Sequence, residues 1–273
     1  MKSSFLLPLI LCVALLPVLR AQDITTTDGQ VLKSSSIRRT GSTIMVKVTT
    51  PEGSSIEMGI PPARIVKISF PEPPELAKAS TASSSGNATE VLSLTGDYVA
   101  KEAELKDLPG SWWPEMSRLR LLALAGTAKD ADAATLAREI GSLKSPDAES
   151  LSRGGTLFAN LPSGDKEAVV VGAKAIPRIG GGQGSALAQL ALGRTLLAKK
   201  DYPGALRAFL TIKVFYPSVT LLQPAALLGA AKAYVGLKDE KRAAEAIKDL
   251  SESYPSSPLV PEVKKLSETL SKP

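Results

Sequence analysis

The sequence predicts a mainly α-helical protein, in which an α-solenoid of helical hairpins follows a small β domain. Composition supports this division, because residues 22–70 are rich in Thr, Ser, Val and Ile, whereas Ala, Leu, Lys and Glu dominate from residue 88 onward. Between these parts, residues 71–87 are rich in Pro, Ser, Thr and Ala. In the helical part a pattern of small and aromatic residues recurs after 38 residues, as in repeat proteins.

Residues 1–21 have the features of a signal peptide. Lys2 precedes an apolar run over residues 5–19, and Ala21 is followed by polar Gln22. The run is shorter than the roughly 18–20 residues that span a bilayer, and no later segment is apolar enough to do so. We therefore expect cleavage after Ala21 and an exported protein, periplasmic or secreted, without a transmembrane segment.

Alternating apolar residues predict short strands over residues 22–70. Glycine-containing turns separate them at residues 28–29, 40–41 and 51–53. Four or five such strands are enough for a small closed or half-closed barrel, and the stretch resembles the SH3-like and Sm-like small barrels. The strands are indicated by three alternating sets, namely Ile44, Val46 and Val48; Ile56, Met58 and Ile60; and Val66, Ile68 and Phe70.

Residues 71–87 carry three prolines and a Ser/Thr/Ala run, with no apolar periodicity. This composition predicts a flexible linker between the β domain and the helices.

The helical part extends from residue 88 to residue 273. A helix is expected over residues 88–106 and hairpins over 114–144 and 147–179. The stretch 261–270 would cover the end of the array as a polar cap. Glycine-rich residues 180–184 are interpreted as a hinge between hairpins, because they lack the Gly-Lys-Ser/Thr ending of a phosphate loop.

The strongest repeat lies within residues 186–258, where two copies of one pattern follow each other. The pattern resembles the 34-residue tetratricopeptide (TPR) repeat. The first copy matches it at Leu192, Gly193, Leu196, Tyr202, Ala205, Phe209 and Pro217, and the second at Tyr234, Ala243, Ile247, Leu250 and Pro255. Small residues allow two antiparallel helices to approach closely, so we expect Gly193 and Ala231 to face Ala205 and Ala243.

Both copies end in Tyr-Pro-Ser, at residues 216–218 and 254–256. In this they resemble periplasmic repeat proteins of the outer-membrane barrel-assembly and Tol-Pal-associated type. The resemblance implies that the repeats bind other envelope proteins and perform no chemistry.

The resemblance also implies which residues line a concave protein-binding groove. In TPR repeats the first helix of each hairpin lines the groove. An apolar floor with one cation from each repeat would suit an extended or helical segment that carries acidic side chains. The corresponding residues are Leu187, Leu190, Arg194 and Leu197, followed by Ala225, Leu228, Lys232 and Val235.

Trp112 and Trp113, the only tryptophans, have two interpretations. They could close the first hairpin against the helix before it, since Pro114 suits a first helical turn. Alternatively, they could form an exposed aromatic anchor for a partner.

The composition argues against catalysis. The 273 residues include 33 Lys+Arg, 27 Asp+Glu, one Cys and no His. Nucleophiles, metal sites and acid–base groups that depend on histidine are therefore absent. We expect no enzymatic activity and no cofactor, and the scarcity of aromatic residues argues against nucleic-acid binding.

The predicted function is that of a non-enzymatic exported scaffold or adaptor in the bacterial cell envelope. An alternative is a glycan- or peptidoglycan-associated accessory protein that binds through its β domain. The partner and the oligomeric state are left open.

Overall fold

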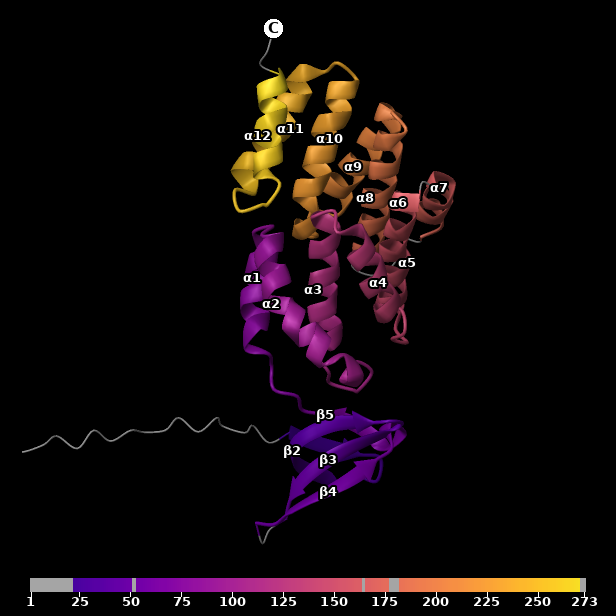
Figure 1. Cartoon of the computed structure of the whole chain (residues 1–273), viewed down its shortest axis with the longest axis vertical. Helices are drawn as coiled ribbons and strands as arrows, with labels where there is room; N and C mark the ends of the chain where they lie inside the picture. The colour runs from indigo at the N-terminus through magenta and orange to yellow at the C-terminus, as the bar shows by residue number, and fades with distance from the viewer. Residues whose placement is uncertain (1–21, 51–52, 164, 177–181, 271–273) are drawn as a thin grey trace, which may run out of the picture. The chain divides into compact units, whose positions relative to one another are not determined.

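The computed structural model describes residues 22–50, 53–163, 165–176 and 182–270. The chain forms two compact units that divide between Pro71 and Glu72 (Figure 1). The predicted signal peptide, residues 1–21, lies outside the described residues.

The N-terminal unit is a five-stranded antiparallel sheet in the order β4-β3-β2-β1-β5. Turns at Gly29 and Gly41, both with positive φ, connect its first three strands. Its elements are β1 (Gln22–Thr26), β2 (Val31–Thr40), β3 (Thr43–Thr49), β4 (Ser55–Ile60), the 3₁₀ helix η1 (Pro62–Arg64) and β5 (Ile65–Ile68).

The strand prediction is correct, but the sheet does not close, so a small barrel, which was expected to be closed or half-closed, is not confirmed. Among the described residues, β4 and β5 stand at opposite ends of the strand order and do not pair. Pro61 and Pro62 follow β4 directly, and a proline has no N–H to donate to a neighbouring strand. The four-residue β5 then pairs with β1, so the sheet keeps an open edge at β4.

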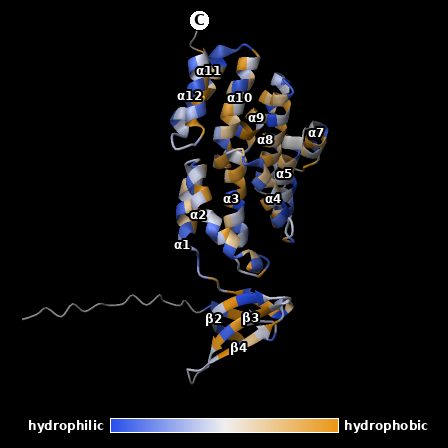
Figure 2. Cartoon of the chain, viewed as in Figure 1, coloured by the Kyte–Doolittle hydropathy of each residue, from blue (hydrophilic) through white to orange (hydrophobic). Residues whose placement is uncertain are grey.

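The C-terminal unit is helical, and successive helices pack against each other (Figure 1). In Figure 2 apolar residues run along α3, which is largely buried. The helices are α1 (Pro74–Ser84), α2 (Ala88–Lys101), η2 (Ala103–Leu105), α3 (Trp113–Gly126), α4 (Asp130–Ile140), α5 (Pro146–Thr156), η3 (Leu157–Ala159), α6 (Asn160–Ser163), α7 (Lys166–Ala175), α8 (Gln183–Ala198), α9 (Tyr202–Phe215), η4 (Thr220–Leu222), α10 (Gln223–Gly236), α11 (Glu240–Ser253) and α12 (Val260–Leu270).

The predicted flexible linker over residues 71–87 is wrong, because most of it forms α1. Pro74 occupies the first helical turn, where its missing N–H costs nothing. Leu76, Ala79 and Ala82 follow at a spacing of three and bury one side of the helix. Because two of these three residues are alanines, the buried stripe is too weakly apolar to stand out in the sequence.

Four helix pairs share one type of connection, the Schellman motif, in which a left-handed residue ends the first helix. The next residue then donates its N–H to a carbonyl five positions back. The left-handed residues are Gly86, Ala128, Lys200 and Lys238. The hydrogen bonds run from Asn87 to Ala82 (2.9 Å), Lys129 to Leu124 (3.0 Å), Asp201 to Leu196 (2.9 Å) and Asp239 to Tyr234 (3.0 Å).

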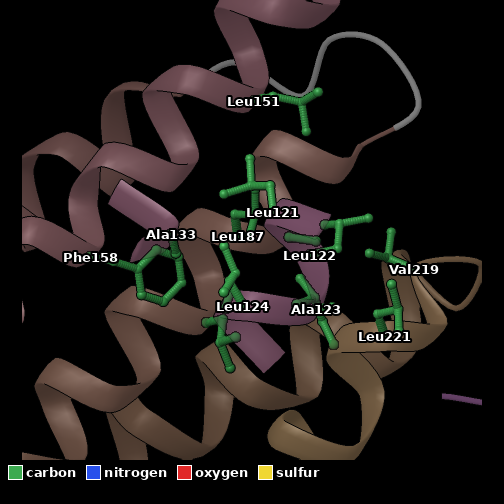
Figure 3. Close-up of a cluster of buried hydrophobic side chains, with 14 of the residues drawn as sticks. Leu121, Leu122, Ala123, Leu124, Ala133, Leu151, Phe158, Leu187, Val219 and Leu221 are labelled. Atoms are coloured by element: carbon green, nitrogen blue, oxygen red, sulfur yellow. The ribbon is translucent and has the colours of Figure 1, made fainter. Parts of the chain in front are cut away.

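One hydrophobic core joins α1 through α10, and a second cluster joins α10, α11 and α12. Figure 3 shows residues 121–124 of α3 beside Leu187 of α8, with Val219 and Leu221 nearby. Helix α3 therefore lies inside the unit, between elements that are distant in sequence.

Phe209 of α9 lies close to glycines of two neighbouring helices. A Cβ atom at Gly193 would lie 2.6 Å from the Phe209 ring, and one at Gly229 would also overlap that ring. The predicted close approach at Gly193 is therefore present, but the facing side chain is Phe209. Without a Cβ atom, α8 and α10 leave room for a fully buried aromatic ring.

We predict that Gly193→Ala lowers the free energy of unfolding of the helical unit by about 1–3 kcal/mol, because the new methyl group overlaps a ring that cannot move away. Urea unfolding followed by circular dichroism measures the change. The control is Gly96→Ala, where the nearest atom is Nη1 of Arg120, at 3.2 Å, at the end of a long side chain that donates a hydrogen bond to the carbonyl oxygen of Leu92. This variant should lose less stability than Gly193→Ala, and equal losses in both variants would contradict the proposed packing.

Candidate functional site

The predicted concave groove is not an open surface in this structure. Leu187 and Leu190 are fully buried, and Leu228 and Ala225 are buried as well. Leu197 and Val235 are partly buried. Four of the six apolar floor residues are thus covered by helix packing, so the prediction of an accessible apolar floor is wrong.

Arg194 is directed into the helical unit, where it holds the connection between α3 and α4. Its Nη1 lies 2.8 Å from Oδ1 of Asp130, and its Nη2 donates a 2.7 Å hydrogen bond to the carbonyl oxygen of Ala125. The guanidinium also lies 5.6 Å from the ring centre of Phe158. Burial raises the pKa of the Asp130 carboxyl, an effect that the guanidinium of Arg194 partly offsets.

Lys232 has a different environment from Arg194, although both occupy the same position of the repeat. Its Nζ lies 2.6 Å from Oε1 of Glu262 on α12, and the two side chains are 40% and 49% exposed. The two cations are thus engaged with α4 and α12 respectively, so they do not act together on the wall of a groove.

We predict that Arg194→Glu destabilises the helical unit by about 2–3 kcal/mol, because it places a second carboxylate beside Asp130 in a poorly solvated site. Chemical denaturation followed by circular dichroism measures the loss. Lys232→Glu makes the same change of charge at an exposed pair and should cost less than about 1 kcal/mol. Similar stability of the two variants would show that Arg194 does not hold the helices together.

Trp113 is a packing residue, as one of the two interpretations predicted. Its ring is fully buried at the start of α3, and its Nε1 donates a 2.9 Å hydrogen bond to the carbonyl oxygen of Val99 in α2. The Nζ of Lys106 lies 5.3 Å from its ring centre. This tryptophan therefore closes α3 against the preceding helix.

Trp112 is only partly buried and lines a hollow of about 910 Å³. One wall comes from residues 106–118, before and within α3, and the other from residues 140–151, at the connection of α4 and α5. Four buried side chains contribute to the apolar part of its lining, namely Leu108, Ile140, Ala148 and Leu151. We call this hollow the Trp112 groove.

Charged side chains of both signs surround the Trp112 groove. Lys106 and Asp107 belong to the first wall, and Lys144 and Asp147 to the second. Within α3, Nε of Arg118 donates a 3.0 Å hydrogen bond to Glu115, so these two charges neutralise each other. The groove thus combines an apolar floor and an aromatic ring with a rim that has no strong net charge.

A smaller hollow of about 240 Å³ adjoins the Trp112 groove and shares Glu115, Arg118, Asp147 and Leu151 with it. Its remaining lining includes Ser150 and residues 182–184 at the start of α8. Residues 180–181 of the predicted hinge lie outside the described residues, whereas Gly182 is the left-handed residue immediately before α8. The two hollows therefore adjoin each other where α3 and α5 lie close together.

The sequence indicated Trp112 as a candidate but not the second wall of the groove. That wall depends on how α4 and α5 pack beside α3, which no local pattern encodes. The sequence Lys144-Ser145-Pro146-Asp147 does mark where α5 begins, because Ser145 caps the helix and Pro146 occupies its first turn. It does not indicate that α5 lies beside α3.

Two searches of the described residues address other kinds of site. No group of three or more acidic, Cys or His side chains is arranged to hold a metal ion. Likewise, no helix in this part of the chain has the length and apolar character needed to cross a membrane.

No family model matches the chain, and no curated protein is significantly similar to it.

Proposed function

We propose that the helical unit is a protein-binding module that holds a segment of a partner in the Trp112 groove. The observation that carries this proposal is the partly buried Trp112 ring beside an apolar floor in a hollow of about 910 Å³. Tryptophans in such settings contribute a large share of the binding energy in protein interfaces.

The lining of the groove favours a peptide segment as its ligand. Trp112 and Leu143, which are both partly buried, offer apolar area to side chains, while the rim offers cations and carboxylates to polar groups of either sign. A helical or extended segment with an apolar anchor residue and mixed charges on both sides would match this arrangement. The groove has no concentration of one charge that would select a small anion or cation.

The proposal includes the class of the helical unit. The pairs α8/α9 and α10/α11 are TPR-like repeats, and their equivalent Schellman connections and aspartate caps at Asp201 and Asp239 support this assignment. Together with the signal-peptide pattern of residues 1–21, the resemblance to periplasmic repeat proteins supports a non-enzymatic adaptor in the cell envelope. The partner would then be another envelope protein.

We predict that Trp112→Ala abolishes or strongly weakens partner binding without unfolding the protein, because the ring is partly exposed at the groove wall. The wild type and the variant are compared as bait in extracts of the source cells, and the retained proteins are identified by mass spectrometry. Phe215→Ala is the control, since it removes an exposed aromatic ring from α9, outside the groove.

A photo-crosslinking amino acid at Lys144, on the opposite wall, tests whether the partner occupies the groove itself. A partner that depends on Trp112 should crosslink there, and the crosslinked peptide identifies the bound segment. A partner retained equally by the wild type and Trp112→Ala, or one that does not crosslink at residue 144, would place the binding surface elsewhere.

A further inference from the structure

Strand β4 is an open edge of the sheet and carries uncovered apolar side chains. It pairs with β3 on one side and ends the strand order on the other (Figure 1). Ile56 is 55% exposed and Met58 is 40% exposed. Since residues opposite each other in an antiparallel pair share a face, Met58 lies on the same face as buried Val46. The apolar face of the sheet therefore continues to its edge without cover.

The two edges of the sheet differ in their protection against pairing with another strand. At the β5 edge the strand has four residues, carries Lys67 and pairs with β1 through a shift in register. These features discourage edge pairing. Strand β4 has six residues, none of them Lys or Pro, and it pairs with β3 from Ser55 to Ile60 without a shift. An edge of this kind is suited to receive a further strand.

We propose that β4 pairs antiparallel with β4 of a second copy of this chain, about a two-fold axis at Met58. In this register Met58 lies opposite Met58 of the other copy, and Ile56 lies opposite Ile60. All apolar residues of β4 then fall on one continuous face. On the other face Glu57 lies opposite Gly59, which has no side chain to oppose it.

Charge supports a second copy as the occupant. Glu57 is the one charged residue of β4, and its Oε1 lies 2.6 Å from Nη2 of Arg38. It also lies opposite Lys47 in the register with β3. In each copy Arg38 and Lys47 thus compensate the charge of Glu57. Two copies can therefore approach without repulsion between uncompensated like charges.

The length of the strand limits how strong this association can be. Six residues extend over about 20 Å. One pair of strands of this length buries less than the roughly 1,200 Å² typical of a stable interface, so the dimer should be weak and depend on concentration.

Sedimentation equilibrium of the purified protein, from about 10 μM to 1 mM, tests the proposal over the range expected for a weak complex. The average mass of the wild type should rise toward that of a dimer. Met58→Lys should keep it at the monomer value throughout, because two ammonium groups would face each other across the axis. The control is Val66→Lys, which makes the same charge change at the β5 edge, at a residue that is 55% exposed, and should dimerise like the wild type.

Mixing two variants tests the position of the axis. Met58→Lys and Met58→Glu should each remain monomeric, but an equimolar mixture should form a dimer, because opposite charges then meet at residue 58. Circular dichroism should show that both variants keep their fold, since Met58 is at an exposed edge. A wild type that stays monomeric at 1 mM would overturn the proposal. The expected occupant of the β4 edge would then be a strand from a different protein. A mixture that fails to associate while the wild type dimerises would overturn the β4 register.

Discussion

The helical unit depends on the contact between the C-terminal end of α3 and the segment that precedes α10. A Cβ atom at Gly126 would lie 2.5 Å from the carbonyl oxygen of Leu221, so only glycine allows the two backbones to meet. The neighbouring carbonyl of Ala125 is bound by Arg194 of α8. In addition, the hydroxyl of Thr220 donates a 2.6 Å hydrogen bond to the carbonyl of Ser83 at the end of α1. These contacts join α1 and α3 to elements that lie 69 to 137 residues later in the chain.

This long-range packing explains why the expected groove is covered although its helices form where the sequence predicts them. In an array whose repeats contact only their neighbours, the first helix of each repeat leaves one face free. Here α3 contacts η4 and α10 as well as its neighbours in sequence. Residues such as Leu187 and Arg194 therefore have internal partners, although their positions in the repeat pattern would place them on an open groove.

The sequence was informative wherever structure is determined locally. Apolar alternation identified the strands, and the repeat pattern located the hairpins that contain α8 to α11. The same local reasoning could have found α1, because Gly86-Asn87 corresponds to Lys200-Asp201 and Lys238-Asp239 as a left-handed residue followed by a capping side chain. Local sequence patterns could not predict whether the sheet closes or what forms the second wall of the Trp112 groove, since both depend on which distant elements pack together. Arg194 and Asp130, for example, are 64 residues apart.

The two surfaces proposed for binding belong to different units, and each exists for a different physical reason. The Trp112 groove exists because other helices pack against the remaining sides of α3. The connection of α4 and α5 therefore forms a hollow beside the first turn of α3. The β4 edge exists because Pro61 and Pro62 end the strand and β5 pairs with β1, which leaves backbone groups and apolar side chains without cover. Neither surface shares a residue with the other. If β4 joins two copies, each copy would still present its own Trp112 groove, and a partner with two suitable segments would bind such a dimer more tightly than a monomer by raising the local concentration of the second site.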